Sequence, residues 1–167
     1  MKNSKNKKFT CKGINNALAI LESNRFNIIN IDILIDGRAD GHLRLKNLFD
    51  NHLVSQLSKD QFHKKYKEGR TQGIIVEFSG KLIESRLPDF KNKSNVCLLA
   101  LDQIKDPQNF GQIIRTAECA GINGILFPQH HSVPITQTVL QVSQGAFVNM
   151  PLYLSLIHIS EPTRRLV

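Results

Sequence analysis

The sequence predicts an α/β fold, with a small N-terminal α/β domain followed by the first half of a second domain built on a parallel sheet. Two patterns indicate this. Residues 13–79 alternate between amphipathic helix patterns and short runs rich in β-formers. After residue 95, an apolar run, a helix pattern and a second apolar run succeed one another, as in a βαβ unit. The 167 residues suffice for two small domains, and an apolar content of 41% is typical of a chain with a buried core.

The N-terminal elements are predicted in the order helix, strand, helix, strand, helix, strand. The first helix rests on apolar residues at positions i, i+3, i+4 and i+7, which are Ile14, Ala17, Leu18 and Leu21. The later elements are a strand over 28–35, a helix stripe at Leu45, Leu48 and Phe49, a strand over 53–57, a helix capped by Ser58 and a strand over 73–78. Residues 13–79 therefore form the predicted N-terminal domain.

The second domain is predicted over residues 95–155. Residues 80–94 lose all periodicity and carry Pro, Gly and charges, so we interpret them as a linker. The elements that follow are a strand over 96–101, a helix over about 109–120, a strand over 125–127, a helix over 135–146 and a strand that starts at 151. The run at 96–101 is continuously apolar, which is typical of a strand buried on both faces.

Positive charge is concentrated in two stretches of a chain whose formal net charge is +8. Residues 1–12 hold five Lys and no acid, and we interpret them as a basic tail; residues 58–93 hold nine basic and five acidic residues. Clustered Lys and Arg favour nucleic-acid backbones, because bound phosphates release their condensed counterions. A solvated tail that keeps the protein soluble is the alternative.

Several classes of protein are disfavoured. Cys11, Cys97 and Cys119 lie far apart and form no C-x-x-C pair, so we expect reduced thiols, no disulfide framework and a cytoplasmic protein. No apolar run is long enough to cross a bilayer, and we expect no membrane partner. His130 and His131 diverge as neighbours and have no further ligand at a suitable spacing, so we expect a surface loop and no metal.

The most informative stretch is D-P-x-N-x-G-x-x-x-R-x-A over residues 106–117. It opens a helix directly after a predicted strand, where α/β sheets place their binding crevices. Asp106 or Asn109 could cap the helix, whose free amides favour an anion. Arg115 projects away from the apolar face, and Gly111, one turn earlier, leaves room for a ligand. An ordinary capped helix with a solvated arginine is the alternative.

This motif resembles the first motif of the SpoU family of S-adenosylmethionine-dependent RNA 2′-O-ribose methyltransferases, the TrmH-like members of the SPOUT superfamily with a knotted, Rossmann-like α/β fold. The match continues through Ala120-Gly121, Leu126-Phe127-Pro128 and Ser143-Gln-Gly145-Ala146. Upstream, residues 13–18 and 71–76 resemble the start and end of the RNA substrate-binding domain in the branch that methylates a guanosine ribose of large-subunit ribosomal RNA. The resemblance covers about residues 13–155.

The resemblance implies roles for particular residues. Arg115 corresponds to the catalytic arginine, which stabilises the ionised 2′-hydroxyl or helps to remove its proton. Arginine stays protonated near neutral pH, so we favour electrostatic stabilisation. Asn109 shapes the motif and helps to position Arg115 or the RNA. Contacts to RNA are expected from Arg70, Gln72, Ser143 and Gly145. The implied cofactor is S-adenosylmethionine, the partner is ribosomal RNA, and the complete protein is expected to be a homodimer.

Two later motifs of the family, a glycine-rich loop with an acidic residue and a final Ser-Leu-Asn stretch, are absent, and no G-x-G-x-x-G or Walker loop replaces them. We therefore expect a C-terminally truncated, inactive fragment with no complete donor site, and we assign no cofactor-binding residue. Residues 156–167 resemble adapter read-through and are expected to be a non-native tail. A non-catalytic RNA-binding module and a tRNA 2′-O-methyltransferase remain as alternatives.

Overall fold

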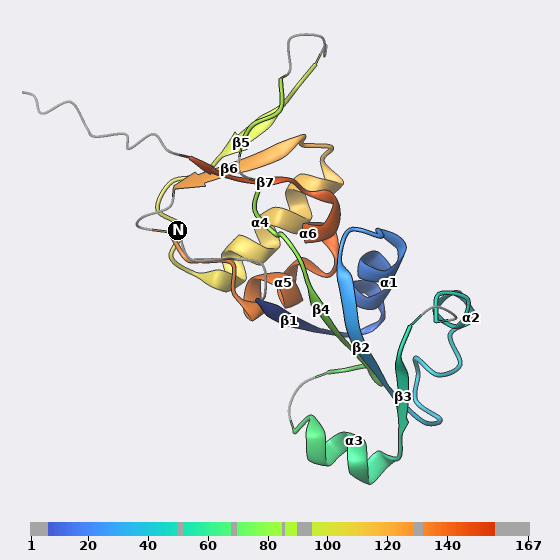
Figure 1. Ribbon diagram of the computed structural model, residues 1–167. Helices are drawn as coiled ribbons and strands as arrows, with labels where there is room; N and C mark the ends of the chain where they lie inside the picture. The colour runs from blue at the N-terminus through green and yellow to red at the C-terminus, as the bar shows by residue number, and fades with distance from the viewer. Residues whose placement is uncertain are drawn as a thin grey trace, which may run out of the picture.

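A computed structural model describes residues 7–49, 52–67, 70–84, 86–89, 95–128 and 132–155. The described chain is a mixed α/β protein with two sheets, one four-stranded in the order β1-β4-β2-β3 and one three-stranded in the order β5-β6-β7 (Figure 1). This architecture confirms the predicted fold class. The predictions for His130, His131 and residues 156–167 lie outside the described residues.

The N-terminal half follows the predicted alternation, with one strand added at its start. Its elements are β1 (Lys8–Lys12), α1 (Ile14–Glu22), β2 (Asn27–Leu34), α2 (Leu43–Lys46), β3 (Val54–Leu57), α3 (Lys59–Lys65) and β4 (Ile74–Ser79). Strand β4 is antiparallel to both of its neighbours, β1 and β2, whereas β3 is parallel to β2. Helix α2 is a single turn, shorter than the stripe ending at Phe49 suggested. Ser58 and Gln61 form the capping box that begins α3.

Strand β1 occupies residues that the sequence analysis placed in the basic tail. Phe9 and Cys11 point into the core, while Lys8, Thr10 and Lys12 are less buried. This alternation has the period of a strand with one buried face. The strand was not predicted because the lysines made this stretch look like a charged tail, although Phe9 and Cys11 alternate with them. Burial raises the pKa of the Cys11 thiol to about 12, so it stays protonated.

A buried carboxylate attaches α3 to the first sheet. Asp32 of β2 is 1% exposed. It accepts hydrogen bonds from Lys65 Nζ at 2.5 Å, from Asn30 Nδ2 at 2.8 Å and from the hydroxyl of Tyr66. Burial opposes ionisation of Asp32, but the bonds from Lys65, Tyr66 and Asn30 outweigh it and lower the pKa of this carboxyl. Burial and the Asp32 carboxylate raise the pKa of Tyr66.

The C-terminal half has a three-stranded parallel sheet. Its elements are β5 (Leu98–Ala100), α4 (Pro107–Cys119), β6 (Gly124–Pro128), α5 (Gln137–Ser143), α6 (Ala146–Asn149) and β7 (Leu152–Ser155). The prediction of one helix over 135–146 was wrong, because Gln144 and Gly145 adopt left-handed conformations that separate α5 from α6. The prediction that the run at 96–101 is buried on both faces was also wrong: among the described strands β5 pairs only with β6, and it is half exposed.

The two halves share one hydrophobic core. Phe26 and Phe78 of the N-terminal half surround Phe147 of α6, with ring centroids 6.0 and 6.1 Å from that of Phe147. The segment after β4 was predicted to be a linker, but Leu82 is buried and the Glu84 amide donates to the Leu152 carbonyl at 2.7 Å. The described part of that segment is therefore packed against the second sheet.

Two glutamines of α5 bond to the open edge of β1, beside which α5 lies in Figure 1. Gln137 Nε2 donates to the Thr10 carbonyl at 2.6 Å. Gln141 accepts from the Lys12 amide through Oε1 and donates to the Lys12 carbonyl through Nε2, both at 2.9 Å. These residues are four apart and so lie on one face of the helix. The glutamines thus satisfy main-chain groups that an edge strand would otherwise leave unpaired.

Candidate functional site

The cap of α4 fixes the start of the predicted motif. The Asp106 carboxylate accepts from the amide of Gln108 at 2.8 Å, and Pro107 occupies the first turn, where a missing amide hydrogen does no harm. Of the two caps that the sequence allowed, the structure selects Asp106. The helix then buries Phe110, Gly111, Ile114 and Ala117, and it leaves Arg115 exposed.

Arg115 lies in a polar hollow of about 240 Å³, which we call the Arg115 hollow. Its lining includes Asn15, Arg115, Glu118, Ser143, Gln144 and Gly145. The structure therefore brings three predicted site residues together: Arg115, Ser143 and Gly145. Arg115 makes no hydrogen bond or ion pair with any described residue, so its guanidinium is available to a ligand. Sequence reasoning assigned no role to Asn15 or Gln144, although both lie in stretches that carry the resemblance, residues 13–18 and 143–146.

Tight packing around Gly145 builds the wall of this hollow. Ser143 is fully buried, and its hydroxyl donates to the Leu140 carbonyl at 2.9 Å. At Gly145, φ is +96°, and an added Cβ would lie 2.7 Å from Ala19 Cβ of α1. Glycine is therefore required here both for the left-handed backbone and for the approach of α1. Ser143 and Gly145 serve mainly to shape the wall.

Gly111 does not leave room for a ligand, as the sequence suggested. A Cβ at this position would lie 2.7 Å from Val142 Cβ and 2.9 Å from the Val139 carbonyl oxygen, both in α5. The missing side chain lets α4 and α5 pack closely. The prediction of ligand space at Gly111 was therefore wrong, and the glycine acts indirectly by holding the Ser143–Gly145 segment near Arg115.

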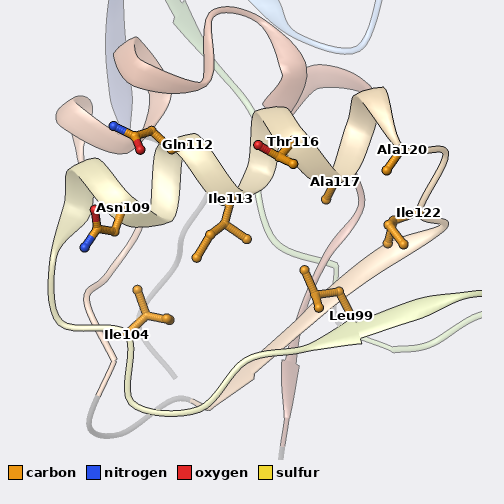
Figure 2. A pocket seen from close by; sticks show the side chains of 9 residues that line it. All are labelled: Leu99, Ile104, Asn109, Gln112, Ile113, Thr116, Ala117, Ala120 and Ile122. Atoms are coloured by element: carbon orange, nitrogen blue, oxygen red, sulfur yellow. The ribbon is translucent and has the colours of Figure 1, made fainter.

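Asn109 lies in a different place from Arg115. It lines a larger hollow of about 600 Å³ between α4 and the loops flanking β5 and β6. Figure 2 shows Ile104, Ile113 and Ile122 around this space, with Asn109, Gln112 and Thr116 along α4. The six-residue spacing between Asn109 and Arg115 turns them well apart around the helix axis. The structure thus does not place Asn109 in the Arg115 hollow.

Arg70 and Gln72 line a third hollow of about 260 Å³, which we call the Arg70 hollow. Its lining includes Lys12, Asn15, Asn16, Arg70, Gln72 and Gln144. Gln72 Oε1 accepts from the Ile14 amide at 2.7 Å and so caps the first turn of α1. Asn15 and Gln144 line both polar hollows. The Arg70 and Arg115 hollows are therefore neighbours along one polar surface.

The described residues do not fit S-adenosylmethionine as a complete donor site. The 600 Å³ hollow is roomy enough, but no charged side chain lines it to meet the ligand's carboxylate and ammonium groups. The Arg115 hollow carries charge but is much smaller. Within the described ranges, no three His, Cys, Asp or Glu side chains gather as metal ligands, and no helix there is long and apolar enough to cross a bilayer.

The sequence match to a family falls on the half that carries Arg115. Residues 97–159 match the model of the SpoU rRNA Methylase family. This segment is therefore similar to the SpoU methylases. A Staphylococcus aureus protein assigned to the TrmH family of tRNA/rRNA methyltransferases is 32% identical over 111 residues, which are 64% of this chain and 45% of that protein. The chain spans about half the length of the curated relatives it matches.

Solved structures of RNA methyltransferases share the fold across both halves of the chain. The rRNA methyltransferase of Sinorhizobium meliloti, crystallised with bound AdoMet, superposes with a TM-score of 0.66 at 19% identity, over 88% of this chain and 54% of that chain. An RNA 2′-O ribose methyltransferase gives a TM-score of 0.66 at 15% identity, over 89% of this chain and 55% of that chain. At these identities the likeness shows the fold alone.

Proposed function

We propose that this chain is part of an enzyme that transfers a methyl group from S-adenosylmethionine to the 2′-hydroxyl of a ribose in RNA. The proposal is carried by Arg115, an exposed arginine without a described partner, on a helix opened by D-P-x-N, beside the Ser143–Gly145 wall. The family match at residues 97–159 supports it. So do the names of the similar proteins, which are tRNA/rRNA and RNA 2′-O-ribose methyltransferases.

Arg115 would act on the hydroxyl electrostatically. A ribose hydroxyl is a weak nucleophile near neutral pH, and a fixed positive charge stabilises the negative charge that develops on its oxygen. Arginine holds its proton under these conditions and offers a planar fork of N–H donors. Ser143 and Gly145 would confine the ribose beside that fork. Asn109 lies outside the hollow, so we propose no contact between it and the reacting hydroxyl.

The resemblance of residues 13–18 and 71–76 supports a finer proposal, that the RNA is large-subunit ribosomal RNA and the nucleotide a guanosine. We also propose that the complete protein is a homodimer and lies in the cytoplasm. Because the described residues do not fit the donor, we propose that the 167-residue chain by itself binds RNA without turnover. An RNA-binding role alone is thus the second candidate for this length of chain.

The test is methyl transfer by the complete protein that contains this chain. Radiolabelled S-adenosylmethionine and unmodified ribosomal RNA should yield a 2′-O-methylated nucleoside after nuclease digestion. Replacing Arg115 by Lys keeps the charge but loses the fork, so we expect turnover to fall about 10²- to 10³-fold, with RNA affinity nearly unchanged.

Arg38→Lys, at another exposed arginine, is the matched control. Turnover near wild type in Arg115→Lys would remove Arg115 from the mechanism. Label on a base in place of a ribose would overturn the proposed reaction.

A further inference from the structure

The Arg70 hollow lies where the two halves of the chain meet. Its lining comes from the β1–α1 junction, from the segment before β4 and from the C-terminal end of α5. Two cations, Lys12 and Arg70, line it, and no acidic side chain among the described residues does so. The remaining lining is almost entirely side-chain amides. A ligand with a negative charge and several hydrogen-bonding groups suits this surface.

Two of the amides are already fixed by the backbone. Gln141 makes two hydrogen bonds with the main chain of Lys12, each 2.9 Å long. Gln72 Oε1 is held by the Ile14 amide at 2.7 Å. These side chains therefore act as a rigid frame across the junction of the halves. A preformed frame lowers the entropy that is lost when a ligand binds.

Other polar groups of the hollow have no partner among the described residues. The side chains of Asn15, Gln144 and Arg70 make no hydrogen bond with any of them. Asn16 is 2% exposed and donates through Nδ2 to the Lys12 carbonyl at 3.0 Å, while its Oδ1 has no partner. A buried acceptor without a partner costs stability, so a donor supplied by a ligand or by water in this hollow would be favourable.

We propose that the Arg70 hollow binds one nucleotide of a single-stranded RNA segment, next to the nucleotide whose ribose lies at Arg115. The two hollows share Asn15 and Gln144, so an RNA strand can pass directly from one to the other. Arg70 meets a phosphate, and Asn15 and Gln144 bond to the edge of the base. The volume of about 260 Å³ lies below the range of roughly 300–1,000 Å³ typical of drug-sized ligands and suits a single nucleoside.

The RNA must be single-stranded because an unstacked base offers its edge to side chains, whereas the edges in an A-form helix are poorly accessible. This inference rests on the proposed RNA-directed function and adds a site that reads sequence beside the methylated position. It also explains why the site needs both halves of the chain, since neither half alone supplies Arg70, Asn15 and Gln144 together.

The test measures binding of the 167-residue chain to fluorescently labelled single-stranded homopolymers of adenylate, cytidylate or uridylate by anisotropy. Arg70→Ala should weaken binding to all three similarly and lower the salt dependence by about one ion. Asn15→Ala and Gln144→Asn should each reduce the ratio between the affinities for the preferred and the other homopolymers, on the order of tenfold. Asparagine is chosen at position 144 because it tolerates the left-handed backbone.

Lys46→Ala and Gln108→Ala are the matched controls, because both residues are exposed and lie outside the two hollows. Thermal unfolding of every variant should match wild type within a few degrees, which keeps binding losses separate from unfolding.

The outcomes distinguish this site from the proposed function. If the wild-type chain binds no RNA, the RNA-directed function itself is contradicted. If Arg115→Ala weakens binding while the three hollow variants behave like the controls, the function stands and the nucleotide site is wrong. Equal binding of all three homopolymers by wild type, or unchanged preference in both amide variants, would overturn base reading and leave a phosphate contact only.

Discussion

The two halves of the chain differ in how their sheets are covered. In the N-terminal half, β4 lies between two strands, and Ile74, Ile75, Val76 and Phe78 are all fully buried. In the C-terminal half, β5 is a half-exposed edge strand, and the 600 Å³ hollow opens beside α4. The N-terminal half packs against one side of the C-terminal half, where it contacts Phe147 and the glutamines of α5. The first half thus contributes to the stability of the second as well as to its ligand surface.

The largest expected effect comes from Phe147→Ala, which removes the ring packed between the halves. Phe147 is 1% exposed, and truncating a buried Phe costs about 3–5 kcal/mol of unfolding free energy. Urea unfolding followed by far-ultraviolet circular dichroism should shift as one transition, because the core is shared. Leu43→Ala, at a residue 79% exposed, is the control. Two separate transitions in wild type would instead support a separate N-terminal domain, as predicted for residues 13–79.

A smaller effect, confined to the C-terminal half, is expected from Gly111→Ala. The added methyl group would meet Val142 and the Val139 carbonyl, so α5 must move away from α4. Overpacking of this kind costs about 1–3 kcal/mol. Gly41→Ala adds a methyl group with nothing within 4 Å and serves as the control. Equal stability of the two variants, measured by urea unfolding, would show that the contact between α4 and α5 is looser than described.

The smallest effect, confined to the N-terminal half, is expected from Asp32→Asn. The folded-state pKa of Asp32 is lowered, so its ionised form stabilises the fold above the unfolded pKa of about 3.9, and this contribution is lost as pH falls through the folded value. We expect about 1 kcal/mol at neutral pH, because the Lys65 side chain is half exposed and solvent weakens its attraction. The difference in unfolding free energy between wild type and Asp32→Asn should become smaller as the pH is lowered.

Asp36→Asn, at an exposed aspartate, is the control for that titration. A gap for Asp32→Asn that widens toward low pH would contradict the direction of the pKa shift.

Local patterns predicted most of the elements, because period and capping are properties of neighbouring residues. The apolar stripe from Ile14 to Leu21 predicted α1, and Asp106-Pro107 predicted the start of α4. The structure places Arg115, Ser143 and Gly145, which the resemblance singled out, in one hollow; their roles stay predictions. Asn109 lines a different hollow, because a helix of fixed pitch carries that side chain to another face.

The contacts between the halves could not be predicted, because they depend on residues far apart in the sequence. Glycine is needed at positions 111 and 145 because another helix packs closely against each of them, α5 at Gly111 and α1 at Gly145. Gln72 caps α1 from 58 residues away, and Gln141 bonds to a strand 129 residues away. The lysines around Phe9 and Cys11 concealed a strand whose partner, β4, lies at the other end of the N-terminal half.

The bonds from Gln137 and Gln141 reach only main-chain atoms of Thr10 and Lys12. Every amino acid except proline offers the same carbonyl and amide groups, so the outward side chains of β1, apart from Lys12 at the Arg70 hollow, can change in evolution while the attachment persists. The two glutamines have no such freedom, since a shorter or branched side chain would not reach the strand. Mutational tolerance at this junction should therefore be one-sided, broad along β1 and narrow along the facing side of α5.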